Sequence, residues 1–367
     1  MALSCGIVGL PNVGKSTLFQ CLTACPAQAA NYPFCTIDPN VGKVAVPDQR
    51  LYQLQQVAKS QRVVPTDVTF LDIAGLVRGA SKGEGLGNQF LAHIREVSAL
   101  CHVVRCFEGE ITHVDGNVDP LRDVGTIETE LILRDIDTIT NRLTKTQRTA
   151  KSGNAQAQDE LQLCQALSEH LNQGLAARTF APPPETHTWP NLIASLHLLS
   201  SKPVLFVANI SEDGLQGDGN AHLQALTQFA QQRGDNVVPV CAHIEQELMQ
   251  LDAQQQQEFL EAYGLQQSGL QRVIAQAFRL LGLMTYFTAG VQEARAWTIT
   301  QGTKAPQAAG VIHTDFEKGF IKAEVCNWKD LIDHNGEAGC RQAGLLRLEG
   351  KDYVVQDGDV IHFKVNA

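Results

Sequence analysis

Short runs of apolar residues alternate with helical stretches through the first hundred positions, and again between positions 200 and 241. The apolar runs predict buried strands at 4–9, 68–73, 99–107, 202–209 and 236–241, and a helix at 16–23 follows the first of them. Continuous apolar strands that alternate with helices are typical of a parallel sheet covered on both faces. The pattern therefore predicts an α/β fold, most simply a doubly wound sheet.

A long segment between 107 and 203 carries no strand pattern, and we expect it to be a helical insertion. Apolar residues recur there at spacings of 4, 3 and 4 and then of 3, 4 and 4, at Ile132, Ile136, Ile139 and Leu143 and at Cys164, Leu167, Leu171 and Leu175. Such seams allow two amphipathic helices to pack antiparallel, with the turn at 152–154. Lys145, Arg148 and Lys151 make the tip of this hairpin basic, which fits either a solvated helix end or a contact with a polyanion.

Residues 281–367 show a different pattern of apolar and polar positions. Apolar and polar residues alternate at 297–300, 320–325, 353–355 and 360–365, which predicts strands of a mixed sheet, with a short helix at 329–334 and a turn at 356–359. We therefore expect three parts: an α/β domain at 1–124 and 200–280, a helical insertion at 125–199, and a small α+β domain at 281–367.

Composition narrows the class of protein. The 367 residues are 44% apolar and 19% charged, so the chain can bury a large core and is neither disordered nor fibrous. A net charge of −10 argues against binding nucleic acid through bulk charge, although local basic patches remain compatible with it. The sequence shows neither an apolar run of about 18 residues nor a basic leader with a cleavage site, so we expect a cytoplasmic protein without a membrane contact. Ten scattered cysteines fit reduced thiols.

The residues at 9–16, Gly-Leu-Pro-Asn-Val-Gly-Lys-Ser, match the pattern G-x-x-x-x-G-K-[ST] and lie between the first predicted strand and its helix. The two glycines let the backbone fold so that successive N–H groups and the helix N-terminus hold phosphate oxygens. Lys15 then reaches the β and γ phosphates, and Ser16 gives its hydroxyl to Mg²⁺. The motif predicts a nucleoside triphosphate site, with Lys15 as a catalytic group.

A second motif follows the strand predicted at 68–73. Asp72 and Gly75 form D-x-x-G, which sets a carboxylate beside the metal, through water, and a glycine that turns towards the γ phosphate. A glycine-rich stretch at 79–87 comes soon after and predicts a flexible hinge. Thr36, in the loop between the two motifs, is the expected second hydroxyl ligand of Mg²⁺ and a candidate catalytic residue. Together these features predict a switch that senses the nucleotide.

Base recognition is expected at the strand predicted at 202–209. Enzymes that read guanine carry N-K-x-D there, whereas this chain has Asn209, Ile210, Ser211 and Glu212. A short aspartate accepts the N1–H and N2 amino groups of guanine side by side, whereas the longer Glu212 displaces that pair of acceptors, and Ile210 takes the place of the lysine stem. Asn209 is able to satisfy the N6 and N7 edge of adenine. We therefore expect ATP to bind at least as well as GTP.

The group that orients the attacking water is not evident from the sequence. Leu76 follows Gly75 where many related enzymes carry a glutamine, and a leucine cannot orient water. His113 is a candidate catalytic residue, because a neutral imidazole accepts a proton at near-neutral pH; a loop histidine without a role is the alternative. Asn12 is a candidate for placing a monovalent cation such as K⁺ against the phosphates.

Taken together, these residues resemble the YchF family, a branch of the Obg group of P-loop NTPases. The resemblance covers nearly the whole chain and rests on the runs G-L-P-N-V-G-K-S-T from Gly9, Y-P-F-C-T-I-D-P-N from Tyr32, D-I-A-G-L-V from Asp72, G-E-G-L-G-N from Gly83, N-x-x-E from Asn209, K-A-P-Q-A-A-G from Lys304 and H-T-D-F-E-K-G-F from His313. It implies an ATPase that associates with ribosomes, both the large subunit and the whole ribosome. It also implies a C-terminal TGS domain of ubiquitin-like β-grasp form, and RNA contact through the helical tip and this domain is part of the expectation.

The resemblance also implies a set of site residues. It maps nucleotide binding onto Asn12, Val13, Gly14, Lys15, Ser16, Thr17, Asn209 and Ile210, and the Mg²⁺ ligands onto Ser16 and Thr36. Gly75 and Glu212 join the nucleotide-binding set through the reasoning on their own motifs. Two other functions stay open: a GTP-dependent translation factor, which the Asn209 motif disfavours, and an RNA- or protein-binding module whose hydrolysis is incidental.

Overall fold

The computed structural model describes residues 3–24, 40–73, 86–109, 117–151, 154–184, 186–215 and 220–366. These residues cluster into two compact units: the first holds the described residues up to 42 and between 70 and 273, and the second holds those between 43 and 69 and from 274 onwards. No helix in the described ranges has the length and apolar character needed to cross a membrane.

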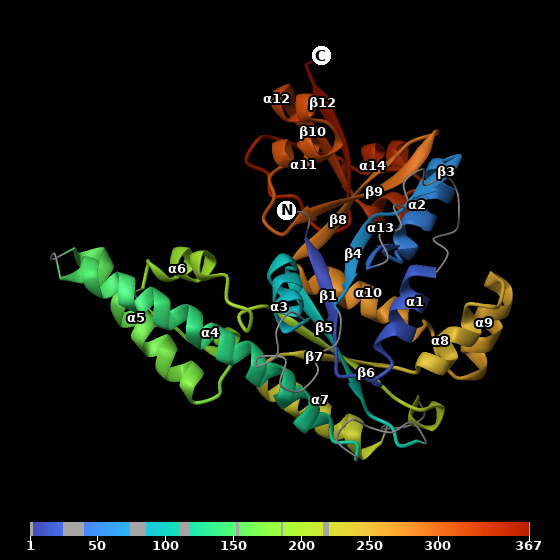
Figure 1. Cartoon of the computed structure of the whole chain (residues 1–367). Coiled ribbons are helices and arrows are strands. Elements are labelled where there is room, and N and C mark those ends of the chain that lie inside the picture. Colours follow the sequence, from blue (N-terminus) through green and yellow to red (C-terminus); the bar gives the residue numbers. More distant parts are fainter. Residues whose placement is uncertain are drawn as a thin grey trace. The chain divides into compact units, whose positions relative to one another are not determined.

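A six-stranded sheet has the order β2-β4-β1-β5-β6-β7 (Figure 1), and it belongs to the first unit except for the parts of β2 and β4 that fall within residues 43–69. Its strands are β1 (Ser4–Val8), β2 (Val41–Ala45), β4 (Asp67–Asp72), β5 (Ala99–Arg105), β6 (Val204–Asn209) and β7 (Asn236–Val240). Around it lie α1 (Lys15–Ala24), α3 (Leu86–Glu96), the 3₁₀ turn η2 (Glu212–Leu215), α7 (Ala221–Arg233), α8 (Ala242–Leu248), α9 (Ala253–Ala262) and α10 (Gly269–Leu280). β1, β5 and β6 are buried along their whole length, which explains their unbroken apolar sequences.

The central strands of this sheet run parallel. β1 pairs with β5, β5 with β6 and β6 with β7, in a register that sets Arg105 opposite Asn209 and Asn209 opposite Val240. Their carboxyl ends therefore reach the same edge of the sheet. Because β4 lies on one side of β1 and β5 on the other, the chain leaves β1 where the strand order changes direction, which is where doubly wound sheets bind their ligands.

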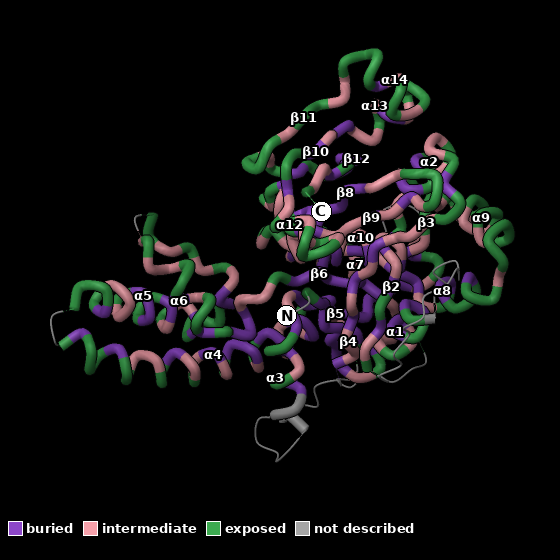
Figure 2. The backbone as a smooth tube through the Cα atoms, turned by 90° about the horizontal axis from the view of Figure 1, so that it is seen from above, coloured by how far each residue is buried: buried purple, intermediate pink, exposed green. Residues whose placement is uncertain are grey.

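Two long helices follow β5: α4 (Pro120–Ala150) and α5 (Ala155–Asn172), with η1 (Ala177–Thr179) and α6 (Trp189–Leu196) after them. Asp119 and Asn154 cap α4 and α5 by accepting hydrogen bonds from the N–H groups of Arg122 and Ala157. Figure 2 shows buried and exposed positions alternating along α4. The expected helical hairpin is confirmed, since its seams pack together through Ile132, Ile139, Leu163, Cys164, Leu167 and Leu171, with Ile136 and Leu143 partly buried beside them.

The second unit holds another six-stranded sheet, with the order β11-β10-β12-β8-β9-β3. Its strands are β3 (Arg62–Val64), β8 (Leu283–Ala289), β9 (Glu293–Thr300), β10 (Phe320–Asn327), β11 (Arg347–Glu349) and β12 (Asp359–Val365), and its helices are α2 (Gln49–Ala58), α11 (Ala305–Ile312), α12 (Thr314–Lys318), α13 (Trp328–Asp333) and α14 (Glu337–Gln342). β8 and β12 pair in parallel, whereas β9 pairs antiparallel with β8 and β10 with β12. The sheet is thus mixed, as the sequence predicts.

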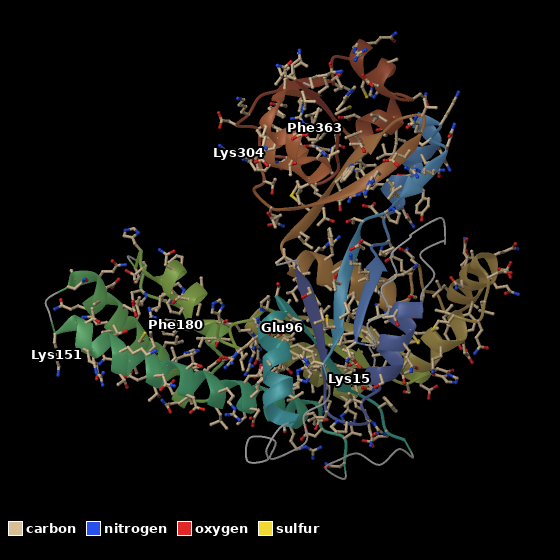
Figure 3. All side chains as sticks on the ribbon, turned by 45° about the horizontal axis from the view of Figure 1, so that its top comes forward. Lys15, Glu96, Lys151, Phe180, Lys304 and Phe363 are labelled. Atoms are coloured by element: carbon tan, nitrogen blue, oxygen red, sulfur yellow. The ribbon has the colours of Figure 1, made fainter. Side chains whose placement is uncertain are left out.

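Apolar residues cover both faces of the second sheet. Tyr286 and Phe363 belong to one cluster with α11, and the Tyr286 hydroxyl donates to the carbonyl oxygen of Ala308 at 2.9 Å (Figure 3 labels Phe363). Phe287 belongs to the other cluster, together with Leu54 of α2. β8 is therefore buried on both faces and shows no polar alternation, which is why the sequence does not reveal it as a strand.

Several expectations about elements differ from the structure. Residues 353–355 do not form a strand, since Val354 makes only an isolated bridge with Lys304, and the apparent alternation comes from Val355 reaching the core. Leu175 follows the end of α5 at Asn172 and is exposed, so it does not extend the seam. Two residues of the expected hairpin turn, 152 and 153, lie outside the described residues.

The segment at 43–69 is assigned to the first domain by the sequence but clusters with the second unit. Its strand β3 pairs in parallel with β9, and Leu51 and Leu54 of α2 join the apolar cluster of the second sheet. No sequence motif in this segment predicts the pairing of β3 with β9, because β9 lies more than two hundred residues further along the chain.

Candidate functional site

The loop between β1 and α1 adopts a backbone that favours glycine at position 14. Gly14 has a φ of +92°, and a Cβ atom there would lie 2.3 Å from Nδ2 of Asn209. The N–H of Leu18 donates to the carbonyl oxygen of Gly14 at 3.0 Å and closes the first turn of α1, whose first residue is Lys15 (Figure 3). The N–H groups of this turn and the helix dipole together form a site for an anion.

Lys15 forms an ion pair with Asp72, the last residue of β4, and both side chains are largely buried. The N–H of Asp72 donates to the carbonyl oxygen of Asn40 at 2.9 Å, and the N–H of Ile73 donates to that of Ile7 at 3.1 Å. These bonds fix the end of β4 beside β1. The phosphate-binding loop and the D-x-x-G motif, which lie far apart in the sequence, therefore meet here. The carboxylate of Asp72 is paired with the ammonium group of Lys15, which is predicted to bind phosphate.

Asn209, which is 3% exposed, joins three segments at the same edge of the sheet. Its Nδ2 donates to the carbonyl oxygen of Val13 at 2.9 Å, and its Oδ1 accepts a hydrogen bond from the N–H of Ala242 at 3.2 Å. A carboxamide has two N–H donors and two acceptor lone pairs, so each of these atoms has the capacity for one further hydrogen bond. The phosphate-binding loop, the end of β6 and the start of α8 are thus held together by a single side chain.

Ile210 and Glu212, which follow Asn209 in the base-recognition motif, differ in exposure. Ile210 is 2% exposed, and its N–H donates to the carbonyl oxygen of Val240 at 2.9 Å, so its side chain belongs to the core. Glu212 opens η2, and its side chain is 44% exposed. Its Oε1 accepts a hydrogen bond from Nδ1 of His243 at 2.7 Å. Glu212 therefore does not stand alone at this edge but is paired with an imidazole.

The helix that carries His243 is fixed by a buried carboxylate. Oε1 of Glu245 accepts hydrogen bonds from the N–H groups of Gly269 at 2.7 Å and Leu270 at 3.3 Å, which caps α10 and ties it to α8. Burial raises the pKa of Glu245, and these hydrogen bonds oppose that rise. Burial also raises the pKa of the Cys241 thiol, so this residue stays protonated and unreactive at neutral pH.

The other predicted site residues fall into two groups. Ser16 and Thr17 follow Lys15 in the first turn of α1, Ser16 with its side chain exposed, and Asn12 lies in the loop before them with a φ of 63°. Thr36, Gly75, Leu76 and His113 lie outside the described residues, so their roles stay predictions.

Two contributions to the site were not expected from the sequence: the backbone N–H of Ala242 and the imidazole of His243. No motif marks either residue. The signal that points to them is position, because both follow β7, whose carboxyl end lies beside that of β6 in the parallel sheet. A sequence search that collects polar residues after every parallel strand would include His243.

A cavity of about 820 Å³ lies in the second unit, lined by residues that include Ala289, Ile312, Phe316, Cys326 and Leu346. None of its lining residues comes from the phosphate-binding loop or from the base-recognition motif. This cavity is therefore not the nucleotide site.

The chain matches two family models and a set of full-length relatives. A model described as "50S ribosome-binding GTPase" matches residues 4–142, and a YchF-GTPase C-terminal model, described as a protein of unknown function (DUF933), matches residues 283–366. The chain is 52% identical to "Ribosome-binding ATPase YchF" of Bacillus subtilis and 50% identical to the protein of that name from Escherichia coli O157:H7, with 100% of each chain covered.

Among solved structures, the YchF GTPase of Schizosaccharomyces pombe superposes with a TM-score of 0.88 at 39% identity, over 99% of this chain and 97% of that one. The similarity thus extends through the sheet of the first unit, the helical hairpin and the second unit. On this evidence of sequence and fold, the chain belongs to the YchF family.

Proposed function

We propose that this protein is an ATPase that binds ribosomes and changes its state with the nucleotide it holds. The relatives at 50% and 52% identity carry the name ribosome-binding ATPase. The observation that carries the proposal is the meeting of Lys15, Asp72 and Asn209 where β1, β4 and β6 of one sheet end. These are the groups needed for the phosphates, the metal and the base.

The phosphate chemistry falls to α1 and β4. Lys15 exchanges the carboxylate of Asp72 for the β and γ phosphates, and the N–H groups at the start of α1 hold the remaining phosphate oxygens. Mg²⁺ prefers hard oxygen ligands, and the hydroxyl of Ser16 and the freed carboxylate of Asp72 are donors of that kind, so the residues fit this metal. Mg²⁺ held by these residues would supply positive charge against the phosphates.

Three residues outside the described ranges, together with Asn12, complete this proposal. Thr36 supplies the second hydroxyl ligand of Mg²⁺, Gly75 turns towards the γ phosphate, and His113 orients the attacking water. Asn12 places K⁺ against the phosphates, and its exposed side chain at the phosphate-binding loop supports that role. Each of these four roles is tested by substitution to alanine and measurement of ATP hydrolysis, with the K⁺ concentration varied in the case of Asn12.

ATP is the proposed substrate in preference to GTP. The chain lacks the aspartate of N-K-x-D, whose two oxygens accept the paired donors of guanine. Glu212 stands in its place, is longer, and already accepts a hydrogen bond from His243. Asn209 retains one N–H and one lone pair for the N6 and N7 edge of adenine. Since the S. pombe relative is named a GTPase, the base preference needs its own measurement.

We place ribosome contact on parts outside the nucleotide site. The tip of the helical hairpin carries Lys145, Arg148 and Lys151, which are exposed and suit an RNA backbone. The domain at 281–367 is proposed to be a TGS domain and a second contact with the ribosome. Along the chain, the insertion at 125–199 separates the two parts of the proposed nucleotide-binding domain, 1–124 and 200–280. Ribosome binding places the protein in the cytoplasm.

The experiment that tests the base preference is equilibrium binding of fluorescent ATP and GTP analogues, with Mg²⁺, to the wild type and to Lys15→Ala. We expect tighter binding of the ATP analogue and its loss in the variant. Tighter binding of the GTP analogue would contradict the proposed base preference and support the alternative function, a GTP-dependent translation factor.

Co-sedimentation with ribosomes tests the switch. Wild type and Lys15→Ala are centrifuged with ribosomes in the presence of ADP or of an ATP analogue that resists hydrolysis. A switch predicts that the wild-type fraction in the pellet depends on the nucleotide, and that Lys15→Ala removes this dependence. Equal binding under all conditions would favour the alternative of a binding module whose hydrolysis is incidental.

A further inference from the structure

His243 comes from the segment that Asn209 fixes at the base-recognition edge. It follows Ala242, whose N–H donates to Oδ1 of Asn209 at 3.2 Å, and its own Nδ1 lies 2.7 Å from Oε1 of Glu212. A second carboxylate, that of Glu247 one turn further along α8, lies 4.0 Å from the same nitrogen. The imidazole therefore stands between two acidic groups and makes its hydrogen bond with the one in the N-x-x-E motif.

Tyr263 lies in the field of the same carboxylates. Desolvation raises the pKa of this phenol, and the negative charges of Glu212 and Glu247 raise it further. The hydrogen bond from the N–H of Ala242 to the side-chain Oδ1 of Asn209 and the buried cap of Glu245 hold α8 in place, so the position of His243 relative to Glu212 is set by the fold rather than by the pair itself.

The hydrogen bond changes what Glu212 can offer a base. A free carboxylate has two oxygens that accept hydrogen bonds side by side, which suits guanine because its N1–H and N2 amino group are both donors. The Nδ1–H of His243 takes one lone pair of Oε1, so only Oε2 keeps its full capacity for a donor of the base. Adenine presents one such donor, its N6 amino group, next to the acceptor N1. The occupied carboxylate therefore disfavours guanine more than adenine.

We propose that His243 is a specificity-determining residue of this ATPase, which acts through Glu212 by taking up acceptor capacity of an oxygen that guanine would need. This inference rests on the proposed function, because it assumes that the base lies at the end of β6. It assigns His243 a positioning role, with no contact to the reacting phosphates.

The test measures the ratio of the dissociation constants of GTP and ATP analogues for His243→Ala. We expect the ratio to fall by about fivefold, mainly because GTP binds more tightly, which corresponds to the net contribution of one hydrogen bond. The side chains of His243 and Glu212 are 65% and 44% exposed, so the variant should fold normally, and an unchanged melting temperature verifies this.

Three further variants separate the pair from a general effect of charge. His243→Asn retains a donor near the position of Nδ1 and should restore the wild-type ratio. Glu247→Gln removes the other carboxylate near the imidazole and should leave the ratio unchanged. In a Glu212→Gln background, His243→Ala should have no further effect on the ratio, because the group through which it acts is altered.

An unchanged ratio in His243→Ala would overturn the proposal, as would an equal shift in Glu247→Gln. A wild type that prefers GTP would instead contradict the proposed base preference, and in that case the response of the ratio to His243→Ala still decides whether the pair influences base selection.

Discussion

We propose that Lys15 exchanges one anion, the carboxylate of Asp72, for another, the phosphates of the nucleotide. Its ammonium group pairs with Asp72 at the end of β4, and the phosphates must displace this carboxylate. In the proposed complex, this exchange would free the carboxylate of Asp72 to face the metal through water. A single ion pair thus links phosphate binding to metal binding.

Lys15→Ala should reduce the rate of ATP hydrolysis by at least about 100-fold, because a fixed positive charge at the transferring phosphoryl group is lost. Steady-state release of phosphate measures this rate. Lys43→Ala, a change at an exposed lysine of β2, serves as the matched control and should hydrolyse ATP at the wild-type rate. Substantial hydrolysis by Lys15→Ala would mean that another cation holds the phosphates.

Rebuilding the guanine-reading motif requires two substitutions with different costs. Glu212→Asp changes an exposed side chain, whereas Ile210→Lys puts an ammonium group at a position that is 2% exposed. We expect Glu212→Asp alone to move the ATP/GTP affinity ratio towards GTP, and the double variant to be destabilised by about 3 kcal/mol. Nucleotide titration and urea unfolding measure the two effects. A ratio that stays constant in both variants would contradict the account of base selection.

His102 gives the first unit a pH dependence with a definite sign. Burial lowers the pKa of His102 to about 4, although the charge of Glu128 opposes this shift. Between pH 6.5 and 4 the unfolded chain therefore takes up a proton that the folded protein does not, so the free energy of unfolding falls as the pH falls. In wild type this imidazole lowers the free energy of unfolding by up to about 3 kcal/mol between pH 6.5 and 4, and His102→Leu should remove that decline.

Urea unfolding at several pH values measures the difference between His102→Leu and wild type. Because other groups titrate equally in both proteins, the difference isolates this imidazole. A difference that does not change with pH would show that folding leaves the pKa of His102 unchanged, and would contradict the lowered pKa.

At the scale of elements, the hairpin is attached to the sheet through a cluster of charged side chains. Arg178 of η1 forms an ion pair with Glu128 of α4 and lies 3.3 Å from Asp235, the residue before β7, while Arg233 of α7 lies 2.7 Å from the other oxygen of Glu128. Burial would raise the pKa of Glu128, but the two arginines outweigh it and the pKa lies below its ordinary value. The stability that this pairing supplies is therefore present at neutral pH and lost as the pH falls through the lowered pKa.

Arg178→Ala should cost about 3 kcal/mol of unfolding free energy at neutral pH, because it leaves two carboxylates largely buried without their shared partner. Adding Glu128→Gln to that variant should recover part of the loss. Denaturant unfolding of the three proteins checks this, and Arg62→Ala is the control, since its side chain pairs with Glu293 but is 65% exposed. Equal losses for Arg178→Ala and Arg62→Ala would contradict the role of burial.

Periodicity predicted those elements whose burial is one-sided or complete over a sufficient length. The seam of α4 is visible because Ile132 and Ile139 recur on one face of a long helix. β8 escapes notice because Thr285 and Thr288 interrupt its apolar run and because it follows the end of α10 after two residues, so the run also suits an extension of that helix. The segment at 353–355 misleads because Val355 is buried by the core of the second unit while its backbone pairs only at one bridge.

At the scale of the whole molecule, nucleotide binding and ribosome binding are proposed for different parts of the chain. The described hairpin carries its basic residues, Lys145, Arg148 and Lys151, towards its tip (Figure 3 labels Lys151). A net charge of −10 repels RNA at long range, so a local cationic patch is needed for contact with a phosphate backbone.

Replacing Lys145, Arg148 and Lys151 by alanine should weaken ribosome co-sedimentation by about tenfold or more at low salt and reduce its dependence on salt concentration. Hydrolysis of ATP by the free protein should stay at the wild-type rate. The control replaces three other exposed basic residues, Lys43, Arg279 and Lys322, and should retain binding. Equal weakening in both triple variants would assign the effect to net charge rather than to the tip.

The sequence alone determined the chemistry that depends on residues close together in the chain. The phosphate-binding loop from Gly9 to Ser16, the D-x-x-G motif and the departure from N-K-x-D are local patterns with local geometry, and they led to the family and the fold class. Tertiary structure decided what depends on distant partners: the pairing of Lys15 with Asp72, the bridge from Asn209 to Val13 and Ala242, and the placement of 43–69 in the second unit. Such contacts arise where parallel strands end side by side, and their partners are set by strand order, which no short stretch of sequence encodes.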